Sequence, residues 1–242
     1  MKGLKEMHVK NNPLILYNCW DVMSAKAIEK AGCPAIATSS FAMSDTLGYD
    51  DGQNLPFDLY LILIKNIMKN ISKPLSVDFE AGFSKNDEEL KIHFKSLLEL
   101  GIKGINFEDK NHFAYDYELY PINKQFKKIA LLRSLSPNDF FINARTDLFF
   151  QKKIHDLSLI DETLERIDAY KEAGADGIFI PGLTDLELIR IICEKSKLPV
   201  NIMVEDISEE ILKSGVSRIS LGPNGYLDTQ NFITEQCQKF LG

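Results

Sequence analysis

The chain has few cysteines and no long apolar run, and both shortages narrow what it can be. Its 242 residues include four cysteines, none of which form a C-x-x-C pair. Four scattered cysteines are too few to stabilise a chain of this size through disulfide bonds. We therefore expect reduced cysteines and a cytoplasmic setting. No segment approaches the roughly 18 consecutive apolar residues of a membrane span. Residues 1–12 are polar and lack the apolar core of a signal peptide.

Positive charge is also in short supply. The chain carries 28 Lys and Arg against 35 Asp and Glu, for a net charge of −7. The lysines are scattered rather than gathered on one stripe, which argues against nucleic acid or an anionic membrane as a partner. A small molecule is therefore the expected ligand. The length suffices for a substantial core and no linker divides it, so we expect residues 1–242 to form a single domain.

A weak internal repeat organises the sequence. Helical patterns end in Gly32, Gly101, Gly174 and Gly215, and a β-rich run follows each glycine within a few residues. Each glycine fits a left-handed helix C-cap. The intervals between these glycines correspond to one or two strand–helix units of roughly 30 residues. Filling the gaps predicts eight such units in the chain.

The predicted elements alternate along the whole chain. The expected strands begin near Leu14, Ala35, Leu75, Gly104, Phe140, Gly177, Val200 and Arg218. The expected helices span residues 24–30, 59–69, 87–100, 123–133, 161–173, 186–195, 208–214 and 231–241. This alternation predicts an α/β fold, a closed (β/α)8 TIM barrel. An open doubly wound sheet is the alternative, but it would normally carry a glycine-rich phosphate loop after its first strand, and residues 17–21 contain no glycine.

Polar and charged side chains follow four of the apolar runs directly. They are Ser39 and Ser40, Asp78 and Glu80, Glu108 and Asp109, and Arg145 with Asp147. Successive parallel strands of a barrel end at one face, where catalytic side chains gather. A core strand has no structural need for so many terminal charges. We therefore interpret these residues as one anionic, metal-binding pocket of an enzyme.

Three of the predicted strand-to-helix connections are unusually long. They cover residues 41–57, 109–122 and 147–157. Long loops on the active face of a barrel can cover a substrate and exclude water, although plain mobile surface is the alternative. The aromatic residues of the second connection make it the better candidate for a lid.

Several motifs, in their order and spacing, resemble the isocitrate lyase and phosphoenolpyruvate mutase superfamily. They lie at residues 17–21, 37–40, 47–52, 77–82, 104–109, 142–147, 173–179 and 218–222. The resemblance covers nearly the whole chain and is greatest to the short, phosphonomutase-like branch. It implies Mg²⁺-assisted chemistry, with Mn²⁺ as another suitable ion, on a small 2-oxo or 2-hydroxy acid through an enolpyruvate-like intermediate. It also implies a homo-oligomer, often with an exchanged C-terminal helix, but this chain ends soon after its eighth predicted helix.

The resemblance assigns the metal site to three carboxylates. Asp78 matches the principal metal ligand, and Glu80 and Glu108 would hold the ion through its waters, which suits a cation that dehydrates reluctantly. Glu80 replaces the aspartate of many family members, and the longer side chain can still reach a metal-held water. The structural alternative for Asp78 is a helix N-cap after its strand.

The resemblance also assigns substrate contacts. Arg145 matches an arginine that pairs with a substrate carboxylate or phosphoryl group, a role that suits its planar fork of donors. A structural ion pair with Asp147 or Glu108 is the alternative, and both roles can coexist. Asn201, after the seventh predicted strand, is a weaker candidate for carboxylate binding.

Two further segments correspond to parts of the family's active site. Ser39, Ser40 and Phe41 match the loop whose hydroxyl and backbone N–H groups hold the acidic end of the substrate, although turn capping alone would also explain the serines. Asp51 falls where the family has an aspartate close to the reacting centre. Its neighbour Asp50 makes a solvated acidic turn the alternative.

The loop after the fourth predicted strand departs from the family. Family lyases carry a K-[KR]-C-G-H sequence there, whereas residues 108–116 contain neither cysteine nor glycine. Family mutases and phosphonopyruvate hydrolases add a lysine and an asparagine where this chain has Ala114 and Asp116. Lys110 and His112 are the candidates for a replacement acid or base, because a histidine titrates near neutral pH. A solvent-facing histidine is the plain alternative.

Three functional hypotheses remain open from the sequence. The leading one is a carbon–carbon lyase or decarboxylase acting on a small 2-oxo or 2-hydroxy carboxylic acid. The second is phosphonate P–C bond chemistry, as a mutase or hydrolase acting on a phosphonopyruvate-like substrate. The third is a metabolite-binding relic that kept the metal site but lost catalysis. The sequence does not identify the substrate.

Overall fold

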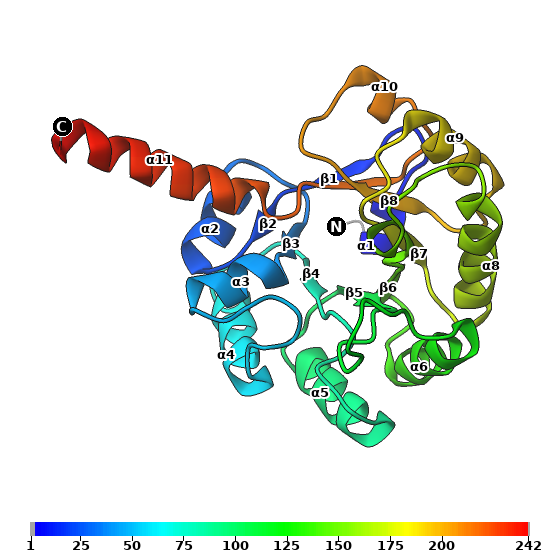
Figure 1. The fold of residues 1–242 in the computed structure, drawn as a ribbon. Helices are drawn as coiled ribbons and strands as arrows, with labels where there is room; N and C mark the ends of the chain where they lie inside the picture. The colour runs from blue at the N-terminus through cyan, green and yellow to red at the C-terminus, as the bar shows by residue number, and fades with distance from the viewer. Residues whose placement is uncertain (1–2, 242) are drawn as a thin grey trace.

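The strands form a barrel in which one interrupted strand completes the ring. The computed structural model describes residues 3–241, and within them the sheet has nine parallel strands in the order β1-β9-β8-β7-β6-β5-β4-β3-β2 (Figure 1). The strands are β1 (Leu14–Leu16), β2 (Asn18–Cys19), β3 (Ile36–Thr38), β4 (Leu75–Asp78), β5 (Gly104–Glu108), β6 (Phe141–Arg145), β7 (Gly177–Ile180), β8 (Val200–Met203) and β9 (Arg218–Ser220). Only Tyr17 separates β1, which pairs with β9, from β2, which pairs with β3. The predicted (β/α)8 class is confirmed.

Helices surround this ring (Figure 1). They are α1 (Leu4–Met7), α2 (Val22–Lys30), α3 (Ser40–Thr46), α4 (Phe57–Met68), α5 (Asp87–Glu99), α6 (Ile122–Leu135), α7 (Leu148–Gln151), α8 (Leu159–Glu172), α9 (Leu186–Lys195), α10 (Glu209–Leu212) and α11 (Asn224–Leu241). In α4 the fully buried side chains are Tyr60, Ile64 and Ile67, spaced so that they share one face. Burial of such faces against the strands produces the main hydrophobic core, between barrel and helices.

The four glycines of the internal repeat end their helices as predicted. Their φ angles are 91° at Gly32, 82° at Gly101, 103° at Gly174 and 100° at Gly215. This left-handed conformation costs an L-residue with a side chain roughly 1–2 kcal/mol. Glycine therefore ends each helix and turns the chain toward the next strand.

Two of the predicted long loops contain helices. The segment 41–57 begins inside α3, where Ala42 and Met43 are buried, and the segment 147–157 contains α7. The prediction of continuous loops there was wrong, because helices this short span too few residues to show a helical period. The last helix also begins seven residues earlier than predicted, at Asn224 rather than at residue 231.

The N-terminal segment covers the end of the barrel where the strands begin. Leu4 of α1 is 2% exposed and belongs to a second apolar cluster with Leu14, Leu16, Ala35, Ala37 and Phe141. Lys5 contacts the Asn138 carbonyl and Asp176, which lie just before the first residues of β6 and β7. This apolar plug leaves the opposite end of the barrel, at the carboxyl ends of the strands, for the chemistry. No helix among residues 3–241 is long and apolar enough to cross a membrane.

Candidate active site

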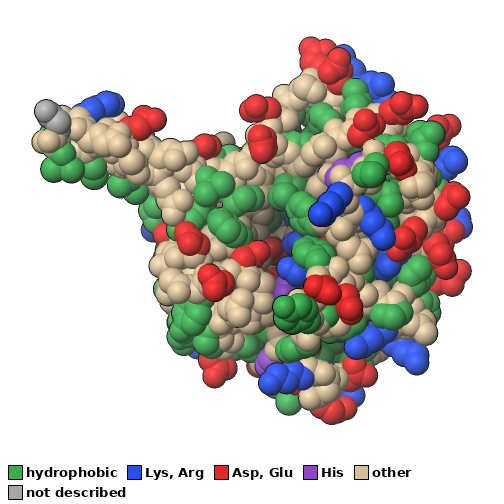
Figure 2. Space-filling view, viewed as in Figure 1, with side chains coloured by type: hydrophobic (Ala, Val, Ile, Leu, Met, Phe, Trp, Pro, Cys, Tyr) green, Lys and Arg blue, Asp and Glu red, His purple; other side chains and the backbone are tan. Residues whose placement is uncertain are grey.

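A cavity of about 190 Å³ lies at the carboxyl ends of the strands. Figure 2 shows the hollow at the centre of this face, with acidic side chains beside it. Its lining includes the predicted residues Ser39, Ser40, Phe41, Asp51, Asp78 and Arg145. Cavities that hold drug-sized ligands typically measure about 300 to 1,000 Å³. The smaller volume here suits a small metabolite.

Asp78, the last residue of β4, is held in place from three sides. Its Oδ2 accepts a hydrogen bond of 2.8 Å from the Ser40 hydroxyl, and its backbone N–H donates to Thr38 Oγ1 at 2.9 Å. Asn106 Nδ2 lies 3.5 Å from its Oδ1. The structural alternative of a helix N-cap is excluded, because Asn86 caps the following helix, α5. The Asp78 carboxylate therefore faces the cavity.

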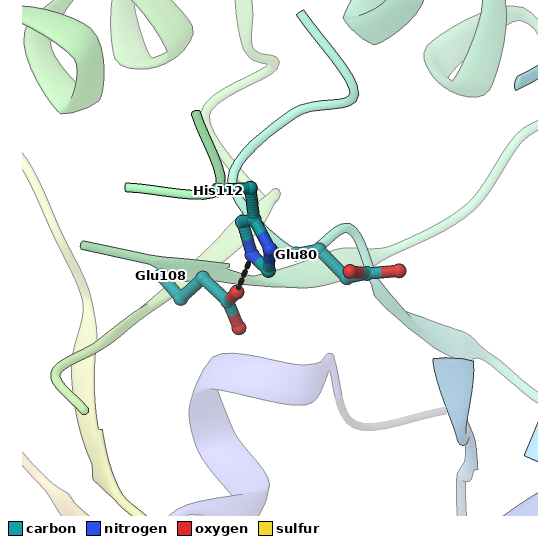
Figure 3. A group of neighbouring side chains, drawn as sticks. All are labelled: Glu80, Glu108 and His112. Carbon is teal, nitrogen blue, oxygen red and sulfur yellow. Dashed lines mark hydrogen bonds and ion pairs between the residues drawn. The ribbon is translucent and has the colours of Figure 1, made fainter. Parts of the chain in front are cut away.

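Glu80, Glu108 and His112 form a cluster beside the cavity (Figure 3). One ligand atom from each residue lies within 4.8 Å of the others. His112 Nε2 is 2.5 Å from Glu108 Oε1, and Glu80 Oε1 is buried without a hydrogen-bond partner. Burial, followed by the negative charge of Glu108, raises the pKa of Glu80 well above its usual value. An imidazole and two carboxylates, one of which has a buried oxygen without a hydrogen-bond partner, fit a divalent cation.

Arg145 connects this cluster to the cavity. It lines the cavity, its NH1 group lies 3.0 Å from Glu108 Oε2, and its Nε lies 2.6 Å from Asp147 Oδ1. Tyr117 donates a hydrogen bond to the other Asp147 oxygen at 2.7 Å. The structural ion pairs that the sequence offered as an alternative are thus present. Their arrangement fixes the guanidinium at the cavity wall.

Asp51 lies at the cavity mouth, on the connection between α3 and α4. Partial desolvation, followed by the charge of Asp78, raises its pKa. Lys110 lies over the Tyr117 ring at 4.6 Å, and neither Lys110 nor His112 lines the cavity. Asp51 is therefore the titratable candidate with direct access to a bound ligand.

Asn201 lies deeper than the sequence suggested. Its side chain is 1% exposed, and its amide bonds to Ser220, with 3.3 Å between Asn201 Nδ2 and Ser220 Oγ. Ser220 lines the cavity, whereas Asn201 does not. Within the described residues, the contact between Asn201 and the cavity passes through Ser220.

The second connection offers only part of the predicted lid. Tyr120 is 5% exposed and packs against Lys124, whereas Phe113 and Tyr115 are largely exposed. Tyr117 is tied to Asp147. Phe113 and Tyr115 remain the candidates for covering a ligand.

Asp109 and Asp147, which the sequence placed in the anionic pocket, lie buried behind it and do not line the cavity. Asp109 is 0% exposed, and its Oδ2 accepts hydrogen bonds from Arg166 NH1 at 3.0 Å and from the Tyr170 hydroxyl at 2.7 Å. Its Oδ1 accepts from the Asp147 N–H at 3.0 Å. Burial raises the pKa of Asp109 to about 6 against the opposing effect of Arg166. This carboxylate positions Asp147 and, through it, Arg145.

Sequence reasoning also missed several residues that line the cavity. Asn18, Asn106 and Ser220 supply polar groups, and Phe150 and Phe179 supply apolar wall. Asn106 interrupts an apolar strand, which was a usable signal. Phe179 ends the motif at residues 173–179 but had no predicted role, and nothing in the sequence marks Phe150.

Comparison with known proteins places this site in a family. The family model described as phosphoenolpyruvate phosphomutase matches residues 4–241. The chain belongs to this family. A Mycobacterium tuberculosis relative named only as an uncharacterized protein is 31% identical over 91% of this chain and 82% of its own. The 2-methylisocitrate lyase of Escherichia coli is 27% identical over 82% of this chain and 68% of its own.

Solved structures agree with the family assignment. A protein named as a phosphonomutase from Burkholderia cenocepacia J2315 superposes with a TM-score of 0.92 and 35% identity, over 97% of both chains. A phosphonopyruvate hydrolase in complex with oxalate and Mg²⁺ superposes with a TM-score of 0.84 and 22% identity, over 99% of this chain and 87% of its own. The family includes lyases and mutases by name. The chain is thus an enzyme of the phosphoenolpyruvate mutase and isocitrate lyase superfamily.

Proposed function

We propose that the chain is a divalent-metal-dependent carbon–carbon lyase or decarboxylase. Its substrate is a small 2-oxo or 2-hydroxy carboxylic acid, and the reaction passes through an enolpyruvate-type intermediate. The observation that carries the proposal is the single cavity lined by Asp51, Asp78 and Arg145, beside the carboxylates of Glu80 and Glu108. Such a set offers a cation-binding region and a carboxylate-binding arginine in one place.

Asp78, Glu80 and Glu108 would hold Mg²⁺ or Mn²⁺. The Glu80 oxygen that lacks a hydrogen-bond partner and the position of Asp78 in the cavity wall support this assignment. When bound, the ion supplies charge that polarises a substrate carbonyl and stabilises an enolate. The Mg²⁺ in the related phosphonopyruvate hydrolase complex is consistent with this choice of cofactor.

The remaining wall binds and orients the substrate. Arg145 presents its guanidinium to a substrate carboxylate, held in position by Glu108 and Asp147. Ser39 and Ser40 line the cavity at the start of α3, where the Ser39 hydroxyl caps the helix and the Ser40 hydroxyl donates to Asp78. In this proposal the same segment also contacts the acidic end of the substrate.

In this proposal Asp51 is the residue that transfers protons to and from the substrate. It lines the cavity, and partial desolvation together with the charge of Asp78 raises its pKa. Phe150 and Phe179 contribute to the apolar part of the cavity wall. An aspartate at this position would return a proton to the carbanionic carbon after bond cleavage.

Phosphonate P–C bond chemistry is the second candidate. It is supported by the family name and by the Burkholderia protein named as a phosphonomutase. It is opposed by Ala114 and Asp116, which stand where the resemblance to mutases calls for a lysine and an asparagine.

Two measurements test the proposal. Calorimetry of oxalate, an enolate mimic, in the presence of Mg²⁺ or Mn²⁺ should show binding that Asp78→Asn abolishes. Turnover of 2-methylisocitrate, dimethylmalate, oxaloacetate and phosphonopyruvate should then identify the reaction. Cleavage of phosphonopyruvate alone would favour P–C chemistry. Oxalate binding without turnover of any of these acids would favour a metabolite-binding relic, and no oxalate binding would refute all three functions.

The outermost helix supports a homo-oligomer. Helix α11 projects away from the barrel in Figure 1, and Figure 2 shows apolar side chains along it. Phe232 is 61% exposed, Ile233 is 56% exposed and Phe240 is 88% exposed. Isolated apolar side chains are common on surfaces, but a row on one projecting helix favours a second subunit as the cover. Light scattering should report an assembly larger than the 27.5 kDa chain.

The four cysteines support the proposed cytoplasmic setting. All four are free, and burial raises the pKa of the Cys19 thiol to about 12 and that of Cys193 to about 12. Thiols of that kind are unreactive packing groups. A reducing compartment would keep the exposed Cys237 in the same state.

A further inference from the structure

We infer that His112 is a direct ligand of the metal site, together with Glu80 and Glu108, and that it makes the site prefer Mn²⁺ or Co²⁺ to Mg²⁺. The inference rests on the metal dependence of the proposed function and names the ion. It also gives His112 a role other than the acid–base role considered from the sequence.

The three side chains are close enough to share one ion. Metal-to-ligand distances of about 2.1 Å allow two ligand atoms to lie up to about 4.2 Å apart across an ion. The ligand atoms of this cluster lie within 4.8 Å of one another, so small side-chain movements would let all three bind one ion. His112 Nε2 and Glu108 Oε1 share a hydrogen bond of 2.5 Å, and its proton would be released when both atoms bind an ion. In Figure 3 the imidazole lies beside both carboxylates.

Glu80 gives an independent indication of a missing partner. Its side chain is 3% exposed, and Oε1 has no hydrogen-bond donor within reach. Leaving such an oxygen buried and unsatisfied costs about 1–3 kcal/mol or more. Among the described residues, Arg145 is the cation nearest to this cluster, and its Nε and NH1 groups already contact Asp147 and Glu108. A bound cation would satisfy the remaining oxygen.

The surroundings of His112 fix its ring toward the acids. The side chain is 7% exposed, and it stands four residues after Glu108 on the loop that follows β5. Gly52 packs against the other side of the ring: a Cβ added there would lie 3.1 Å from His112 Nδ1. The ring does not line the substrate cavity. This position suits a ligand better than a group that exchanges protons with the substrate.

An imidazole changes which ion the site prefers. Mg²⁺ prefers oxygen ligands and keeps its waters. Imidazole nitrogen binds first-row transition ions better, and its affinity is higher for Co²⁺ than for Mn²⁺. A site made only of carboxylates would discriminate weakly between Mg²⁺ and Mn²⁺. Adding one nitrogen should raise the affinity for Co²⁺ and Mn²⁺ relative to Mg²⁺.

The test is spectroscopic and needs no substrate. The purified chain is loaded with Mn²⁺, and electron spin-echo modulation is used to detect an imidazole ¹⁴N coupled to the ion. Calorimetry then compares Mg²⁺, Mn²⁺ and Co²⁺ for the wild type, for His112→Gln and for His155→Gln. Glutamine at residue 112 can still donate to Glu108. His155 is an exposed histidine bonded to the Phe149 carbonyl, which makes it a matched control.

The expected result is a ¹⁴N signal in the wild type and in His155→Gln but not in His112→Gln. Loss of a coordinated nitrogen should weaken Co²⁺ and Mn²⁺ binding by about tenfold or more, following the usual effect of disturbing a ligand shell, with a much smaller change for Mg²⁺. Bound Mn²⁺ without nitrogen coupling in the wild type would overturn the inference, even if His112→Gln failed to fold. If nitrogen coupling is present but oxalate does not bind and no acid turns over, the proposed function fails while the ligand assignment stands.

Discussion

Replacement of Arg166 by methionine should destabilise the fold strongly. Arg166 lies on α8 with a side chain that is 7% exposed, and it compensates the charge of Asp109, which is fully buried. The substitution would leave Asp109 with two hydrogen bonds, from the Tyr170 hydroxyl at 2.7 Å and from the Asp147 N–H at 3.0 Å. The carboxylate would then be buried without a countercharge.

The magnitude follows from the burial of this pair. Removing one partner of a buried ion pair typically costs about 3–5 kcal/mol, because the remaining charge stays uncompensated. The pKa of Asp109 is already raised to about 6 by burial, so without Arg166 it can take up a proton near neutral pH. Protonation caps the penalty, and we expect a loss at the lower end, about 3 kcal/mol. That is a large part of the roughly 5–15 kcal/mol that stabilises a typical domain.

Urea unfolding near neutral pH measures this loss from the transition midpoint at unchanged slope. The double variant Arg166→Met with Asp109→Asn should recover part of the stability, because the uncompensated charge is gone. Lys213→Met is the control: its ion pair with Glu209 is exposed, and its loss should change stability by less than about 0.5 kcal/mol. A loss below about 1 kcal/mol for Arg166→Met would refute the view that Asp109 depends on this countercharge.

Three further predictions test the fold and the site. His8 has its pKa lowered to about 3, mainly by burial, so below 6.5 the unfolded chain binds a proton that the folded chain refuses. Stability is therefore lost as the pH falls, and by pH 5 the wild type should lose about 2 kcal/mol more than His8→Phe. Gly174→Ala should cost about 1 kcal/mol more than Gly32→Ala, because an added Cβ would lie 2.6 Å from Arg133 Cγ at the first position and near nothing at the second. Arg145→Lys should weaken oxalate binding by about 10- to 100-fold through loss of charge-assisted hydrogen bonds.

Each of these predictions has a contradicting outcome. Parallel stability curves for the wild type and His8→Phe between about pH 7 and pH 5 would show that His8 is protonated in the folded chain. Equal losses for the two glycine variants would show that Arg133 moves aside at no cost. Unchanged oxalate affinity in Arg145→Lys would remove the arginine from the ligand site and leave it a purely structural role.

The sequence was sufficient to predict the barrel, because its signals are local. Apolar runs bounded by turn residues predict strands, and a glycine that ends a helix needs no information from distant residues. The predicted strand starts and helices α4, α5, α6, α8 and α9 therefore match the structure within a few residues, whereas α11 begins seven residues earlier than predicted. Helices α3 and α7 are too short to show a period, and the tertiary structure stabilises them through a few buried side chains. The apolar plug at Leu4 depends on contacts with strands far along the chain.

The candidate site likewise has one part that the sequence predicted and another part that only the structure shows. Strand ends in a parallel barrel point to one face, so the sequence was enough to predict that Asp78, Glu80, Glu108 and Arg145 lie near one another. Their individual partners follow from the three-dimensional packing. Asp78 turns toward Ser40, Arg145 pairs with two acids, and His112 turns inward to Glu108. These contacts depend on how the loops pack against one another. The sequence pattern shows where a strand ends, but it does not show which neighbouring residue the side chain at that end will contact.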